Sequence, residues 1–184
     1  LNLILFGKPG SGKGTQANIL KENILPDLNI LTVSSLLKEK SQDESILGKD
    51  IKNKMDNGDL IEDTIVISVL KEKVNTLSNE QILIDGFPRS SIQADSLLEI
   101  FENKDLSIIN FDVDDEQLLQ RIKKRSMEES RADDSFFEKR LQIYKKSHLE
   151  ILNSLKKNYS VHDIQANDEI SSVTTKIIDK LGLN

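Results

Sequence analysis

A glycine-rich segment follows directly after an apolar run at the beginning of the sequence. Residues 7–16 read Gly-Lys-Pro-Gly-Ser-Gly-Lys-Gly-Thr-Gln, and Leu1–Phe6 before them have the composition of a buried strand. Glycines let backbone N–H groups approach phosphate oxygens, and a helix that starts here turns its positive end toward the same anion. Lys13 adds a positive charge that can follow a phosphate during transfer. The pattern therefore predicts a nucleotide-binding phosphate loop between a strand and a helix.

A second apolar run ends in a carboxylate. Ile82-Leu83-Ile84 precede Asp85, and Gly-Phe-Pro-Arg follow at residues 86–89. Beside a phosphate loop, an aspartate at the end of a strand orients Mg²⁺ or its water ligands. A lone aspartate in this position is commonly only the cap of a turn, but the glycine-rich segment upstream and Arg89 downstream favour the metal. We therefore expect Mg²⁺ as the cofactor, held by Asp85 through water.

Arginine is scarce and unevenly distributed. The chain has 20 lysines and five arginines, and all five arginines lie within residues 89–140. They are Arg89, Arg121, Arg125, Arg131 and Arg140. Arginine offers a rigid fork of donors that grips phosphate at two points, which lysine cannot do. Helix-surface pairing with Glu128, Glu129 and Glu138 is the alternative, but in a lysine-biased chain we favour phosphate contacts.

Length and composition exclude several classes of protein. The 184 residues suit one domain, and 37% hydrophobic and 30% charged residues are typical of globular proteins. The chain has no cysteine, so disulfides and a cysteine-ligated structural zinc are excluded. The net charge of -6 argues against a general affinity for nucleic acid or acidic membranes. We expect a cytoplasmic enzyme with small-molecule substrates and no nucleic-acid or membrane partner.

Apolar runs and amphipathic segments alternate along the whole chain, which predicts an α/β fold with a parallel sheet. Strands are expected at Leu1–Phe6, Leu28–Leu31, Gln81–Asp85, Ser107–Val113 and Asn158–Ile164. Helices are expected at Gly12–Leu25, Ser45–Asn57, Asp63–Leu77, Ser90–Phe101, Asp115–Lys124 and Glu169–Leu181, with Asp63 and Asp115 as N-caps. An apolar stripe from Phe137 to Leu155 predicts the longest helix. Two weakly apolar stretches, 33–61 and 126–135, are expected to cover a cleft.

Taken together, these motifs resemble the adenylate kinase family of nucleoside monophosphate kinases. The resemblance continues in the family's order through Gln93-Ala94-Asp95, Phe111-Asp112-Val113, Arg121-Ile122, Arg131-Ala132-Asp133-Asp134 and Arg140-Leu141. The glycine and threonine at 14 and 15 are also the family's form of the loop. The resemblance implies a monomeric P-loop kinase of one domain, 1–184, with a parallel five-stranded sheet flanked by helices. A helical acceptor-binding insert at 32–62 and a short lid at 126–135 would cover its ligands, ATP and AMP or ADP.

The resemblance further implies roles for individual residues. ATP would contact Gly10, Ser11, Gly12, Lys13, Gly14 and Thr15, Arg121 would stack on its adenine, and Arg125 would contact its phosphates. On the acceptor side, Arg89, Arg131 and Arg140 would bind phosphate, Gln93 would bind the base, and Asp59, Leu60, Ile61 and Gly86 would line the pocket. Lys13, Arg89, Arg125, Arg131 and Arg140 would form the catalytic set. A phosphate oxygen of AMP is already anionic, so transfer requires neutralisation of charge and no general base.

The acceptor insert departs from the family pattern. Val33 stands where a threonine contacts the acceptor base, and Lys38 where an arginine grips the acceptor phosphate, so both are assigned to the AMP site. Ser35 replaces a carboxylate near the metal, and a short segment before Arg140 predicts that this arginine is displaced around its helix. Three functions therefore stay open: an adenylate kinase with weakened AMP binding, a kinase for another nucleoside monophosphate, and a non-catalytic nucleotide-binding member of the family.

Overall fold

A computed structural model of the protein describes residues 1–77, 80–102, 105–128 and 137–183, with only the backbone described at 125–128. Arg131 and residues 129–135 of the expected lid lie outside the described residues, and so does the side chain of Arg125.

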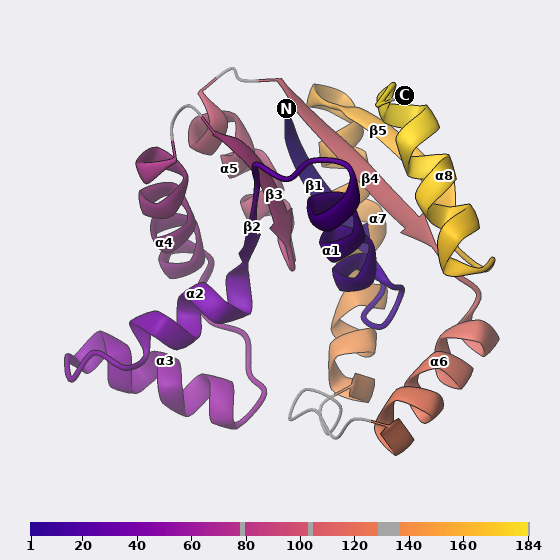
Figure 1. The fold of residues 1–184 in the computed structure, drawn as a ribbon. Coiled ribbons are helices and arrows are strands. Elements are labelled where there is room, and N and C mark those ends of the chain that lie inside the picture. The colour runs from indigo at the N-terminus through magenta and orange to yellow at the C-terminus, as the bar shows by residue number, and fades with distance from the viewer. Residues whose placement is uncertain (78–79, 103–104, 129–136, 184) are drawn as a thin grey trace.

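Five parallel strands form one sheet, as the alternation of apolar and amphipathic segments predicted (Figure 1). The strands are β1 (Asn2–Gly7), β2 (Leu28–Thr32), β3 (Gln81–Asp85), β4 (Leu106–Asp112) and β5 (Ser160–Gln165). Their order in the sheet is β2-β3-β1-β4-β5, so β1 lies in the centre. Every residue of β1 is buried, which explains why Leu3–Phe6 form a continuous apolar run.

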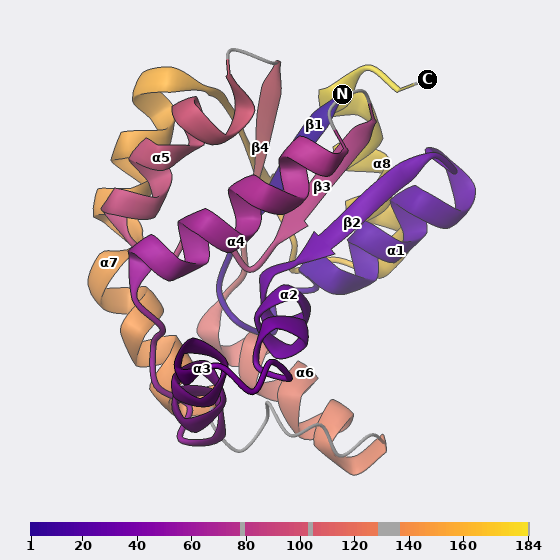
Figure 2. The same cartoon turned by 90° about the vertical axis from the view of Figure 1, so that its left-hand side faces the viewer.

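Helices cover both faces of the sheet, and Figure 2 shows α4 in front of the sheet, running roughly along the direction of β2. The helices are α1 (Lys13–Asn23), α2 (Val33–Lys40), α3 (Ile46–Asp56), α4 (Asp63–Thr76), α5 (Ser91–Phe101), α6 (Asp115–Glu128), α7 (Phe137–Asn158) and α8 (Ile170–Leu181). Side chains of β1 alternate between two cores. Ile4 and Phe6 pack with residues of α4, α5 and α7, while Leu3 and Leu5 pack with residues of α1 and α8. In the described part of the chain, no helix is both long and apolar enough to cross a membrane.

The carboxyl ends of the parallel strands meet at one edge of the sheet. α1 begins there after β1, α2 and α3 continue from the end of β2, and α6 continues from β4 (Figure 1). Loops at this edge form the ligand sites of open α/β sheets. The fold therefore places the glycine-rich segment, Asp85 and the loop between β5 and α8 at the same edge.

Asp63 and Asp115 are not N-caps, contrary to the prediction. Each is the first residue inside its helix, and each carboxylate binds side chains from other elements. Asp63 binds two side chains at the start of α5. Asp115 lies 2.6 Å from Lys145 Nζ and 2.7 Å from Lys8 Nζ, and these hydrogen bonds lower the pKa of Asp115 to about 2. Both carboxylates therefore form tertiary contacts, although the local sequence pattern predicted that they would cap their own helices.

Two predicted boundaries were wrong because helices continue further than their apolar stripes. α7 runs to Asn158, so β5 begins at Ser160 and not at Asn158. α6 runs to Glu128, so residues 126–128 of the expected lid are helical. Unbranched lysine, arginine, methionine and glutamate residues have high helix propensity, so a helix can continue through them beyond its apolar stripe.

Candidate active site

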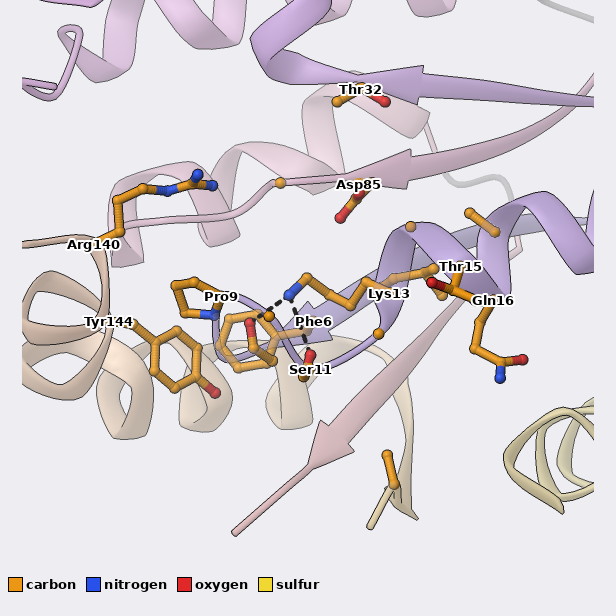
Figure 3. Close-up of a pocket in the computed structure, with 18 of the residues that line it drawn as sticks. Phe6, Pro9, Ser11, Lys13, Thr15, Gln16, Thr32, Asp85, Arg140 and Tyr144 are labelled. Carbon is orange, nitrogen blue, oxygen red and sulfur yellow. Dashed lines mark hydrogen bonds between the residues drawn. The ribbon is translucent and has the colours of Figure 1, made fainter. Parts of the chain in front are cut away.

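A cavity of about 880 Å³ opens at the carboxyl edge of the sheet (Figure 3). Its wall combines the glycine-rich segment, the ends of β2 and β3, one face of α7 and the loop between β5 and α8. The volume lies in the range of small-molecule sites. The fold thus brings both chemical motifs of the sequence to one cavity.

The segment between β1 and α1 has the backbone geometry of a phosphate loop. Gly10 and Gly12 have φ of +79° and +98°, a region that favours glycine. A Cβ atom at Gly10 would also lie 3.0 Å from Cδ1 of Ile122, so the loop packs closely against α6. Gly12 precedes α1 without a side-chain cap, and the first N–H groups of the helix can therefore bind an anion.

Lys13 lies inside this loop, and its ammonium group is held by backbone oxygens (Figure 3). Its Nζ donates hydrogen bonds to the carbonyl oxygens of Gly7 at 2.9 Å and Lys8 at 2.8 Å. Burial lowers the pKa of Lys13 to about 8, although the nearby carboxylate of Asp85 opposes the shift. The protein therefore holds a lysine whose charge is poorly solvated, and an arriving phosphate would stabilise that charge.

We expect ATP binding to take up protons at alkaline pH. Near pH 8.5 part of the free protein holds Lys13 in its neutral form, because burial lowers the pKa to about 8. The triphosphate favours the ammonium form and raises this pKa, so a proton must be taken up as ATP binds. At about pH 6 the lysine is already charged and contributes no uptake. Titration calorimetry in buffers of different ionisation enthalpy measures the effect.

The control for this experiment is Lys13→Met, which should lose the alkaline proton uptake but keep any contribution from other groups. A binding enthalpy at pH 8.5 that does not depend on the buffer would contradict the expectation. So would an uptake of equal size in the methionine variant.

Asp85 ends β3 and faces the start of α1 (Figure 3). A Cβ atom on Gly14 would lie 3.7 Å from Asp85 Oδ2, so the carboxylate stands against the first turn of the helix. Among the described residues, no three histidine, aspartate or glutamate side chains gather into a metal site made by protein alone. Mg²⁺ in nucleotide sites usually binds one or two carboxylates together with phosphate oxygens and water. Asp85 fits such a site as an anionic anchor beside the phosphate loop.

Three of the predicted arginines line the cavity, namely Arg89, Arg121 and Arg140. Arg89 Nε donates a hydrogen bond to the Gly86 carbonyl at 2.9 Å, which fixes its guanidinium at the end of β3. Both Arg89 and Arg140 contribute to the lowered pKa of Lys13, so they lie within electrostatic reach of it. Part of the cavity wall is therefore positively charged and suited to binding phosphate.

The predicted acceptor residues lie in different environments. Leu60 and Gly86 line the cavity, whereas Ile61 is buried in the core and Lys38 is exposed. The Val33 side chain also lies in the core, 4% exposed, while its neighbours Thr32 and Ser34 line the cavity. Asp59 is exposed, and its carboxylate lies 2.6 Å from Lys139 Nζ, which joins the insert to the start of α7. Roles for these residues in binding AMP stay predictions.

Gln93 is buried, 3% exposed, and both atoms of its amide have partners. Its Nε2 donates to Asp63 Oδ1 at 2.7 Å, and its Oε1 accepts from the backbone N–H of Arg89 at 2.8 Å. A side-chain amide has a second N–H and a second acceptor position beyond these two hydrogen bonds. In the structure itself, Gln93 links the starts of α4 and α5 and orients the Arg89 backbone.

Sequence reasoning missed two parts of the wall. The first is one face of α7, where Tyr144 and Ser147 follow Arg140 at helical spacing. The second is the segment between β5 and α8 together with the first residue of α8, of which Ala166, Asp168, Glu169 and Ile170 line the cavity. Its position directly after a parallel strand was the available signal, because such loops gather at one edge of the sheet.

The sequence is similar to known proteins over nearly its whole length. The family model described as adenylate kinase matches residues 5–160. An adenylate kinase of Flavobacterium psychrophilum is 35% identical over 184 residues, which covers 96% of each chain. An adenylate kinase of Leptospira biflexa is 31% identical, covering 97% of this chain and 98% of its own. One of Hyphomonas neptunium is 41% identical over 150 residues, or 78% of each chain.

The matched residues include the phosphate loop from its glycines to Gln16, the Asp85–Arg89 segment and Arg140. These are the groups that the fold brings to the cavity. With the parallel sheet, the loop geometry and the similarity in agreement, the chain belongs to the adenylate kinase family.

Proposed function

We propose that this protein transfers a phosphoryl group reversibly from ATP to AMP, giving two molecules of ADP. The observation that carries the proposal is the placement of Lys13, Asp85, Arg89 and Arg140 around one cavity beside the N-terminus of α1. The relatives named above are adenylate kinases, which supports the same reaction here.

The reaction requires that negative charge on the phosphates is neutralised and that the attacking oxygen is aligned with the γ-phosphorus. An AMP phosphate oxygen attacks the γ-phosphorus of ATP while the bond to the β–γ bridging oxygen breaks, and ADP leaves. Lys13 and the α1 N-terminus stabilise negative charge on the donor phosphates, and Arg89 and Arg140 stabilise it on the acceptor and the transferring group. Asp85 would hold Mg²⁺, which neutralises further charge on the donor phosphates when bound. No described histidine lines the cavity, in keeping with a reaction without a general base.

The proposal divides the site into two halves. The donor half comprises Gly10, Ser11, Gly12, Lys13, Gly14, Thr15, Arg121 and Arg125. The acceptor half comprises Val33, Lys38, Asp59, Leu60, Ile61, Gly86, Arg89, Gln93, Arg131 and Arg140. It also places the enzyme in the cytoplasm as a monomer without nucleic-acid or membrane partners, which light scattering on the purified protein and fractionation of cells would test.

A coupled assay of ADP formation tests the function directly. ATP is offered with AMP, GMP, CMP, UMP or dAMP, and AMP is expected to give the highest kcat/KM. Preference for another monophosphate would favour the second function, for which Val33 and Lys38 in the acceptor insert are the motivating residues. ATP binding without transfer to any monophosphate would instead favour a non-catalytic role.

Asp85→Asn is expected to raise the Mg²⁺ concentration needed for half-maximal rate by about 10- to 100-fold. The amide is similar in size but lacks the charge that anchors the cation. Metal-free ATP should bind the variant at least as tightly as the parent, because a carboxylate beside Lys13 repels the triphosphate. Kinetics over a Mg²⁺ series and ATP titration in a chelator measure the two effects.

Asp27→Asn is the matched control, since Asp27 is an exposed carboxylate that does not line the cavity. An Asp85→Asn protein with an unchanged Mg²⁺ dependence would remove Asp85 from the metal site.

A further inference from the structure

Gln16 closes the glycine-rich motif, yet the proposed reaction gives it no task. Its side chain is 3% exposed although it borders the cavity. A buried amide is costly unless its donor and acceptor are both paired. The pairing that Gln16 makes therefore indicates what it does in the fold.

Gln16 joins α1 to the start of α8. Its Nε2 donates to the carbonyl of Ile170 at 3.0 Å, and its Oε1 accepts from Thr174 Oγ1 at 2.8 Å. Thr174 is itself buried, 9% exposed. These partners are 154 and 158 residues away in the sequence, so the contact exists only in the folded chain. Both atoms of the amide have a partner.

The segment fastened in this way, residues 166–170, forms one wall of the cavity. Its other end is fastened by Arg121, whose Nη2 donates to the Ala166 carbonyl at 2.6 Å and whose Nη1 donates to the Ser11 carbonyl at 3.4 Å. Gln16 and Arg121 therefore tie the two ends of the segment to the phosphate loop and the helix that follows it.

The charge of the segment decides which part of a nucleotide it can face. Asp168 and Glu169 both line the cavity. Asp168 is paired with Lys176 at 2.6 Å, so its charge is partly compensated, but the segment brings no cation toward the ligand. A triphosphate would avoid this wall, whereas a neutral base or ribose would not.

We propose that Gln16 is a positioning residue for the base of the donor nucleotide. It sets the distance between the phosphate loop, which takes the triphosphate, and the segment 166–170, which takes the uncharged end of ATP. This inference rests on the proposed function. In this role the Gln16 side chain acts through Ile170 and Thr174, to which both of its amide atoms are hydrogen-bonded.

The experiment compares ATP with inorganic tripolyphosphate, which has no base. Gln16→Met removes both hydrogen bonds at similar size, and we expect KM and Kd for ATP to rise about three- to tenfold. KM for AMP and the inhibition constant of tripolyphosphate should each change by less than about twofold. Thr174→Val removes one of the two bonds and should give a smaller rise, so it serves as the second variant if Gln16→Met fails to fold.

Asn2→Leu is the matched control for lost stability. Asn2 is another buried amide, and it donates to the Asp105 carbonyl at 3.1 Å, but it does not line the cavity. Asn2→Leu removes a buried amide and its hydrogen bond outside the cavity lining, and it should leave KM for ATP unchanged. An equal rise in the tripolyphosphate constant would overturn the inference, since Gln16 would then support the phosphate loop. Unchanged ATP binding in both variants would overturn it as well.

Absence of transfer in the parent protein would refute the proposed function, and calorimetric ATP binding would still test Gln16.

Discussion

Replacement of Lys13 by methionine is expected to lower kcat by about 10³-fold or more while the protein stays folded. Lys13 Nζ lies in the phosphate loop, where burial leaves its charge poorly solvated. A charge that water does not screen interacts strongly with a phosphoryl group in transit, and methionine fills the same space without it. Steady-state assay of ADP formation under saturating ATP and AMP measures the loss.

Lys21→Met is the matched control for this variant. Lys21 lies on the same helix and also donates to a backbone carbonyl, that of Leu28 at 3.0 Å, but it does not line the cavity. It should keep nearly full activity. A folded Lys13→Met protein with near-normal turnover would refute the catalytic role of the phosphate loop.

The same variant should not be less stable at neutral pH. Folding lowers the pKa of Lys13 from 10.5 to about 8, so the folded state disfavours the charged lysine. The resulting penalty is fully present below about pH 8 and is relieved as the pH rises toward 10.5. Lys13→Met lacks the penalty, and its advantage in melting temperature over the parent should shrink between about pH 7 and pH 9.5. Thermal unfolding at the two pH values measures this difference.

Arg89→Lys is expected to lower kcat by about 10²-fold although the charge is kept. The Arg89 guanidinium donates through Nε to the Gly86 carbonyl at 2.9 Å, which fixes its orientation at the cavity wall. Lysine offers a point charge without this anchor and without a planar fork for phosphate. Because the donor loop is untouched, KM for ATP should stay within about twofold, while KM for AMP should rise.

The comparison of KM for ATP with KM for AMP is the informative part of the Arg89 experiment. Equal losses toward both nucleotides would indicate that the substitution disturbs the whole turn after β3. Rates equal to those of the parent would show that the second phosphate contact is unnecessary. Either result would contradict a specific two-point contact of Arg89 with the acceptor phosphate.

Local sequence was enough to predict the glycine-rich turn between β1 and α1 and most of the fold. The glycines at 10 and 12 adopt positive φ because few other residues can, and that preference is readable without any tertiary contact. Leu3–Phe6 of β1 are apolar without interruption because both faces of the strand are covered, and such runs predict the buried strands of a parallel sheet. The order of the strands and helices could therefore be predicted, with errors mainly at helix ends.

Only the tertiary structure decided where the polar side chains are used. Asp63 has the sequence context of a helix cap, but the folded chain brings Gln93 within 2.7 Å of its carboxylate. The pKa of Lys13 falls because the fold buries the amine, a property that no spacing along the chain records. Gln16 donates a hydrogen bond to Ile170, 154 residues away in the sequence. This part of the cavity wall forms only when α1 and α8 pack together in the folded chain. Backbone preferences are local, whereas burial, distances and neighbouring charges depend on how the whole chain packs. The glycine-rich motif could therefore be predicted from the sequence, but the side-chain contacts that hold it in place could not.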